Sequence, residues 1–144
     1  MRQLAVARHW YLFLVILMFG GCTHDIGPSE AELKAQWDAQ NIYPASYKDD
    51  LLAFLRTYLN DPSHIRGATV TTPQLKPVGR GPRYVACVRF NARDSGGKYV
   101  GSKDGAAIYA SGKLDRFLDM PREVREFCKD AAYGPFPELE QLSR

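Results

Sequence analysis

Apolar residues recur at helical spacing in two segments that follow the first 29 residues. Ser29 and Glu32 have the spacing of a capping box, which predicts a helix over residues 30–40. A second helix is expected over residues 47–59, where apolar side chains recur at steps of three and four. This pattern predicts one buried face, made of Tyr47, Leu51, Phe54, Leu55, Tyr58 and Leu59.

The middle of the chain changes to a strand pattern. Residues 65–72 are rich in β-branched side chains and stop at Pro73, which predicts a strand, and residues 74–82 (QLKPVGRGP) are expected to form a loop. Residues 83–93 alternate and give the strongest strand prediction in the chain. One face carries Tyr84, Ala86, Val88, Phe90 and Ala92, and the other carries Val85, Cys87, Arg89, Asn91 and Arg93.

A turn and two shorter apolar segments follow this strand. Asp-Ser-Gly-Gly at residues 94–97 is typical of a turn, and residues 98–100 are expected to begin a return strand. The segment Gly-Ser-Lys-Asp-Gly at residues 101–105 interrupts that strand by a bulge or a second turn. Residues 106–111 predict a further strand, which Gly112 ends.

The last elements complete the fold class. Pro121 suits a first helical position and predicts a helix that continues to about Ala131. The tail over residues 133–144 contains two prolines and is expected to lie along the surface with a short final turn. The order predicts an α+β domain, with N-terminal helices packed on a three- to four-stranded antiparallel meander and a C-terminal helix.

The start of the chain has no amphipathic pattern. Arg2 and Arg8 precede an unbroken apolar stretch from Trp10 to Phe19. A bilayer-spanning helix needs about 20 apolar residues, so this stretch is too short to cross. Positive residues followed by a short apolar run are typical of a secretion signal, which we expect to occupy residues 1–21.

The end of this signal resembles a known processing site. Phe19-Gly20-Gly21-Cys22 is similar to the lipobox of bacterial lipoproteins, with Phe19 where Leu, Val or Ile is usual. The resemblance implies that Cys22 carries the lipid and becomes the new amino terminus, so that the membrane is one partner. The alternatives are an ordinary cleaved signal, in which Cys22 is incidental, and an uncleaved helical anchor.

Processing at Cys22 would leave a short tether, residues 22–29, before a single periplasmic domain, residues 30–144. Thr23 stands where Asp would retain enterobacterial lipoproteins in the inner membrane. By that resemblance, the expected location is the outer membrane, facing the periplasm.

The two remaining cysteines, Cys87 and Cys128, are predicted to form a disulfide in this oxidising compartment. The closed loop would stabilise the fold by roughly 4 kcal/mol. The alternative is a nucleophilic thiol, but neither cysteine lies in a redox motif. With the disulfide formed, the C-terminal helix must cover the strand face that holds Val85 and Cys87, while the helix over residues 47–59 covers the other face.

The charge is unevenly distributed along the chain. Between Pro62 and Leu118 there are 10 basic and 3 acidic residues, whereas the flanking segments are acidic. The strand alternation and the hairpin predict a basic strip suited to carboxylates or phosphates. The alternative is a solvated sheet face whose charges discourage edge aggregation. The basic strip consists of Arg80, Arg83, Arg89, Asn91, Arg93, Lys98 and Lys103.

Candidate catalytic residues are few. Asp61, Ser63 and His64 lie close in sequence, but a turn that ends a helix explains them better than a triad, which is assembled from separate segments. Asp49 and Asp50 suit the first turn of a helix, where the dipole favours carboxylates. No ligands cluster at metal spacing and no nucleic-acid motif is present, so we expect no metal, no cofactor and no nucleic-acid partner.

Two functions of different class remain. Residues 85–93 (VACVRFNAR) resemble small proteobacterial envelope lipoproteins, a group that brings no known activity. We expect a non-enzymatic lipoprotein that binds an envelope protein, peptidoglycan or anionic lipid, or that has a structural role. The alternative is a cell-wall or lipid-modifying enzyme.

Overall fold

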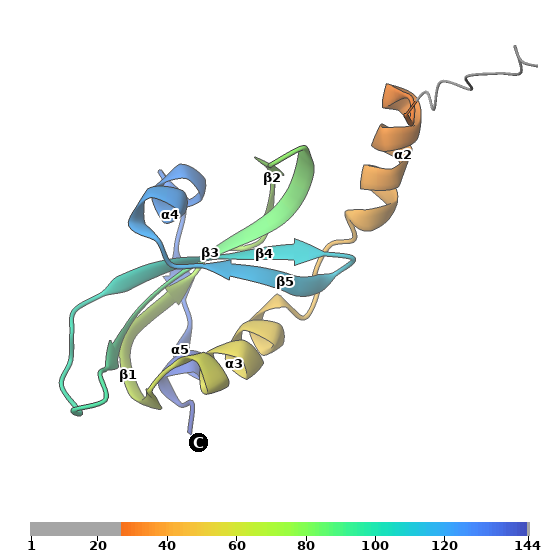
Figure 1. The fold of residues 1–144 in the computed structure, drawn as a ribbon. Helices are drawn as coiled ribbons and strands as arrows, with labels where there is room; N and C mark the ends of the chain where they lie inside the picture. Colours follow the sequence, from red (N-terminus) through yellow and green to blue (C-terminus); the bar gives the residue numbers. More distant parts are fainter. Residues whose placement is uncertain (1–26, 144) are drawn as a thin grey trace, which may run out of the picture.

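The computed structural model describes residues 27–143, so the expected signal, Cys22 and most of the tether lie outside the described residues. Within this range no helix is both long and apolar enough to cross a membrane. The elements in chain order are α2 (Glu30–Gln40), α3 (Tyr47–Tyr58), β1 (Asp61–Val70), β2 (Gln74–Val78), β3 (Gly81–Arg93), β4 (Lys103–Ala110), β5 (Lys113–Leu118), α4 (Pro121–Cys128), β6 (Gly134–Pro135) and α5 (Pro137–Glu140) (Figure 1). The α+β class is therefore confirmed.

An antiparallel sheet of six strands forms the centre of the molecule, in the order β5-β4-β3-β1-β6. β3 pairs with β4 along one edge, while β1 and β2 lie end to end along its other edge. The prediction of three or four strands is wrong, because it omitted β2, β5 and β6. β2 was predicted as a loop because it lacks alternation and contains Pro77, which an edge strand tolerates.

Two predictions around the hairpins also need correction: the return strand over residues 98–100 and the interruption over residues 101–105, since β4 already begins at Lys103. Residues 98–100 form no return strand; only an isolated bridge joins Arg93 to Tyr99. Asp94 instead holds the loop closed by accepting hydrogen bonds from the amides of Gly96 and Lys98, both at 2.9 Å. After β4 the chain turns through Ser111 and Gly112, both with positive φ, and returns as β5.

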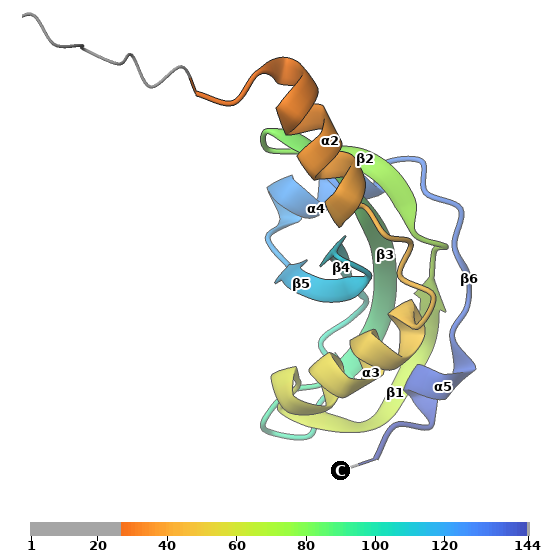
Figure 2. The same ribbon diagram turned by 90° about the vertical axis from the view of Figure 1, so that its right-hand side faces the viewer.

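The alternation predicted for β3 is confirmed by two separate apolar clusters. On one face, Leu51 and Leu55 of α3 pack in a cluster with Ala86, Val88 and Phe90. On the other face, Phe127 of α4 packs with Val85, Ala106 and Ile108. Figure 1 shows α3 and α5 below the sheet and α4 above it, and Figure 2 shows β1 and β3 curving around α3.

The C-terminal tail belongs to the core, contrary to the surface position predicted for it. Phe136 and Leu139 are fully buried and Leu142 is 6% exposed. β6 pairs with β1, and the amide of Phe136 donates to the carbonyl of Ala68 at 2.9 Å. The prolines interrupt any regular pattern here and thereby conceal three apolar residues that recur at steps of three.

α2 differs from the expected packed helix, although its bounds and its Ser29–Glu32 capping box are as predicted. It has no buried residue and contacts the sheet near its own C-terminal end. There the ring of Trp37 lies against Gly81, where an added Cβ would come within 2.6 Å of it. Figure 2 shows α2 beside the β2–β3 turn, whereas α3 lies on the face of the sheet.

Candidate functional site

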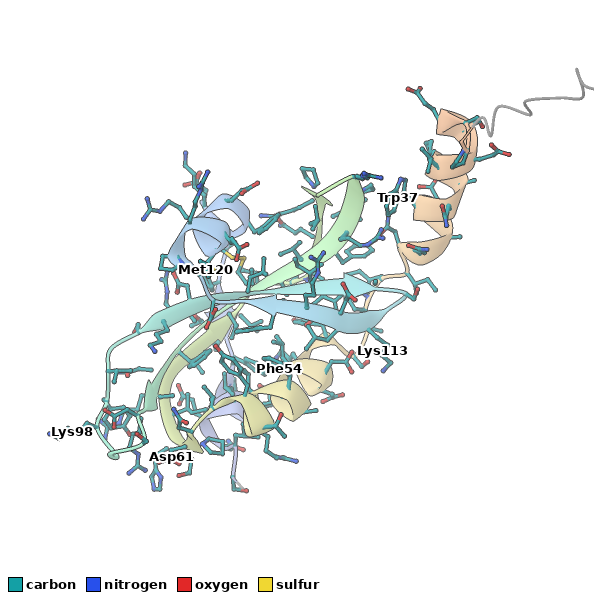
Figure 3. All side chains as sticks on the ribbon, viewed as in Figure 1. Trp37, Phe54, Asp61, Lys98, Lys113 and Met120 are labelled. Carbon is teal, nitrogen blue, oxygen red and sulfur yellow. A yellow bond between two sulfur atoms is a disulfide. The ribbon has the colours of Figure 1, made fainter. Side chains whose placement is uncertain are left out.

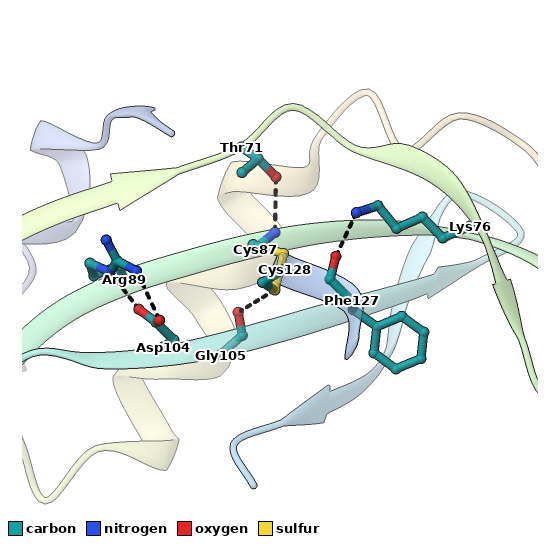
Figure 4. The surroundings of a disulfide bond; sticks show 8 residues. All are labelled: Thr71, Lys76, Cys87, Arg89, Asp104, Gly105, Phe127 and Cys128. Atoms are coloured by element: carbon teal, nitrogen blue, oxygen red, sulfur yellow. Dashed lines mark hydrogen bonds and ion pairs between the residues drawn. A yellow bond between two sulfur atoms is a disulfide. The ribbon is translucent and has the colours of Figure 1, made fainter. Parts of the chain in front are cut away.

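A disulfide joins Cys87 of β3 to the last residue of α4, Cys128, as predicted. The Cα atoms are 5.8 Å apart. The amide of Cys87 donates to Thr71 Oγ1 at 2.9 Å, and Lys76 Nζ of β2 donates to the carbonyl of Phe127 (Figure 4). The disulfide and Lys76 therefore both fix the C-terminal end of α4 against the sheet.

The two arginines at the centre of the predicted basic strip face carboxylates. Arg89 donates two hydrogen bonds to Asp104, at 2.6 and 2.9 Å, and its guanidinium lies 4.8 Å from the ring centroid of Tyr133. The Asp104 hydrogen bond raises the pKa of Arg89. Arg93 Nε lies 3.3 Å from a carboxylate oxygen of Asp61, an ion pair without hydrogen-bond geometry. Both charges are therefore largely compensated.

The remaining strip residues have separate surroundings. Arg83 donates to the side chain of Gln40 and lies 4.5 Å from the ring centroid of Trp37, so it holds α2. The Asn91 side chain accepts from the amide of Gly101 at 3.1 Å. Lys98 is exposed on the loop after β3 (Figure 3). Exposed Lys103 lies at the start of β4, and among the strip residues it shares a cleft with Arg93.

This cleft has a volume of about 740 Å³, within the roughly 300–1,000 Å³ of small-molecule sites. It lies at the open end of the β4–β5 hairpin, where β4 begins and β5 ends, beside the second half of β3. Its walls come from the ends of α3 and β5, the second half of β3, the loop before β4, and α4. Sequence reasoning missed it, because these elements are far apart along the chain. The lining includes Tyr58, Phe90, Val100, Lys103, Phe117 and Arg125.

Packed aromatic rings form one wall of the cleft. The ring centroid of Phe117 lies 5.4 Å from that of Tyr58 and 5.0 Å from that of Phe54, and Phe54, which is not part of the lining, also stacks on Tyr58. A Cβ at Gly105 would come within 2.2 Å of the Phe117 ring. The missing side chain therefore leaves room for the tip of this ring against β4. A glycine within an apolar strand was the one local signal of this close approach.

The acidic side chains of the cleft are already engaged. Asp104 pairs with Arg89, Asp94 accepts amides of its own loop, and Asp119 accepts the hydroxyl of Tyr58. Within the described residues, by contrast, no carboxylate forms an ion pair with Lys103, Arg125 or Lys129, which are exposed and line the cleft. Asp94 and Asp119 keep their negative charge, because their hydrogen-bond donors are neutral, so three cations without an ion-pair partner stand beside two carboxylates and leave a small excess of positive charge.

The hydrogen bond to Asp119, with partial burial and the carboxylate charge, raises the pKa of Tyr58 to about 12. Because the neutral phenol is favoured in the folded state, this stabilisation is present below the unfolded pKa of about 10 and is lost as pH rises through 12.

We expect Asp119→Asn to lower the pKa of Tyr58, because it removes the carboxylate that accepts the phenol hydrogen bond. The pKa is measured by phenolate absorbance and assigned to Tyr58 with the variant Tyr58→Phe. Asp115→Asn, on β5, is the matched control; an equal shift there would contradict this origin.

Asp61, Ser63 and His64 form a hydrogen-bonded chain in an order that differs from a catalytic triad. Ser63 Oγ donates to Asp61 at 2.5 Å and lies 3.0 Å from His64 Nδ1. Ser63 is thus central and donates its hydrogen bond to the carboxylate of Asp61, whereas a triad needs histidine between the serine and the carboxylate. A shallow polar hollow beside Asp61 and Ser63 does not include His64 in its lining.

Groups of three or more His, Cys, Asp or Glu able to hold a metal ion do not occur among residues 27–143. Comparisons of this chain with protein-family models, with curated proteins and with solved structures find no match.

Proposed function

We propose that the protein is a non-enzymatic lipoprotein of the bacterial cell envelope, anchored by lipid at Cys22, whose domain binds a partner on the periplasmic side of the outer membrane. The observation that supports this proposal most is the Cys87–Cys128 disulfide. Such bonds persist in oxidising compartments and are rare in the cytosol, so the disulfide agrees with export by the signal at residues 1–21.

A binding role accounts better for the geometry than catalysis does. The cleft combines aromatic surface with cations that have no ion-pair partner among the described residues, the usual composition of a site that holds a ligand. An enzyme of the cell wall or of lipids would need a nucleophile or base in working geometry, and the Asp61–Ser63–His64 chain lacks that geometry. The partners we consider remain an envelope protein, peptidoglycan or anionic lipid.

Replacement of the lipidated residue tests the anchor. We expect Cys22→Ser to abolish acyl labelling of the protein in cells and to leave unprocessed precursor, because serine has no thiol to accept the lipid. Labelling with a clickable fatty acid and the shift of the protein band on a gel measure both effects.

Phe19→Leu is the control for this experiment. It restores the residue usual in the lipobox and should leave both acylation and processing intact. Acyl labelling that persists in Cys22→Ser would overturn the anchored role.

A further inference from the structure

We propose that the cleft binds a single-chain anionic amphiphile, with its apolar chain along the wall of Phe117 and its anionic head at the mouth, beside Lys103, Arg125 and Lys129. This inference rests on the proposed binding role and names the ligand class. It concerns a site separate from Cys22.

The apolar surface continues from the interior of the cleft to its mouth. Phe90 is 4% exposed and Phe117 is half-buried, whereas Tyr58 and Val100 are 44% and 49% exposed. Met120, 62% exposed, stands between the lining residues Asp119 and Pro121, at the connection from β5 to α4 (Figure 3). Exposed apolar side chains gathered at one site mark a binding surface, and here they extend outward from a cleft.

The cations define the polar end of the ligand. Lys103 comes from β4, and Arg125 and Lys129 come from α4 and the residue that follows it, so two elements bring positive charge to one cleft. All three side chains are exposed, whereas Phe90 is buried and Phe117 is half-buried. A ligand whose apolar chain lies inside the cleft and whose anionic head lies outside it would contact both the apolar lining and the exposed cations.

The position of the cleft favours such a ligand over a peptide. A peptide that adds to a sheet needs a free strand edge along its length. The cleft lies at the end of the β4–β5 hairpin, and its lining on the edge strand β5 is limited to Phe117. Inorganic phosphate alone would leave the aromatic wall without a partner.

Photolabelling of the full chain in phosphatidylcholine nanodiscs tests the inference. The probe is octyl phosphate with a diazirine at the end of its chain, and mass spectrometry locates the labelled residues. We expect labelling of the cleft lining, and weaker labelling there by octyl glucoside with the same diazirine. Excess inorganic phosphate should compete poorly, because it lacks the chain; full competition would show that free phosphate is the ligand and would overturn the inference.

Paired variants separate the cleft from the rest of the basic surface. Arg125→Gln with Lys129→Gln should weaken labelling by octyl phosphate about five- to tenfold, and labelling by octyl glucoside should change little. Arg80→Gln with Lys98→Gln removes the same charge from strip residues outside the cleft and should leave the labelling unchanged. Equal losses in the two pairs would overturn the site.

A second pair tests the apolar half without disturbing the core. Val100→Ser, at the mouth, should reduce labelling by both probes about threefold or more. Leu75→Ser is the control, because Leu75 on β2 is 51% exposed and lies outside the cleft. Equal labelling in wild type and Val100→Ser would contradict the placement of the chain.

The experiments can overturn the anchored role and the amphiphile site independently of each other. Full chain carrying Cys22→Ser should be labelled in the cleft like wild type. Absence of cleft labelling in both proteins overturns the amphiphile site even if Cys22 is acylated. Acylation without Cys22 overturns the anchored role even if the cleft is labelled.

Discussion

Removal of the Cys87–Cys128 disulfide is expected to lower the free energy of unfolding by about 4 kcal/mol in the chain-entropy model, because the bond closes a loop between residues 41 positions apart. The effect is large, because native proteins are in general stable by only about 5–15 kcal/mol. The bond also joins α4 to β3, so α4 should lose its amide protection before the central strands do.

Urea unfolding of the Cys87→Ala, Cys128→Ala double variant measures the loss. Alanine is the better replacement, because Cys87 is only 1% exposed and a serine hydroxyl there would need a buried partner. Wild-type protein in reductant is the control and should unfold near the midpoint of the double variant. If the oxidised and reduced proteins unfold at the same urea concentration, the disulfide contributes no stability.

Much of the sheet was predictable because β3 is buried on both faces. Its alternation assigned Ala86, Val88 and Phe90 to one side and Val85 and Cys87 to the other, and both assignments are confirmed. The cysteine count then placed the C-terminal helix on the second face. These inferences depend on strand geometry and covalent chemistry, which the local sequence determines.

The pairing partners of β3 were less predictable. β3 has 13 residues, and β1 covers only its second half, so the first half is free to pair with β2. Nothing in the residues of β2 alone indicates a strand. Its conformation follows from the free edge of β3, which is a tertiary property.

The partners of the functional residues were also not predictable from local sequence. Alternation correctly separated Arg89 from the Val88 face, but the register that sets Arg89 opposite Asp104 was unknown from sequence. The predicted strip therefore contains charges that the fold pairs. The cleft joins Tyr58, Phe117 and Arg125 from three elements, and no local pattern connects them.

Phe136→Ala is expected to lower the free energy of unfolding by about 3–5 kcal/mol, because a fully buried ring would leave a cavity in the larger apolar cluster. The centroid of the ring also lies 5.3 Å from Lys48 Nζ, and Phe136 directly follows β6. Its loss would weaken the attachment of α5, which packs beside α3 through the Lys48–Glu138 ion pair.

The same measurement decides between the two placements of the tail. If the whole tail lay along the surface, as predicted from the sequence, Phe136 would tolerate alanine with a change of about 0.5 kcal/mol or less. Leu75→Ala, at a half-exposed position on β2, provides the matched control and should show such a small change. Urea unfolding of both variants gives the two values. A loss in Phe136→Ala no larger than in Leu75→Ala would contradict the burial of the tail, and with it the contribution of residues 136–142 to the core.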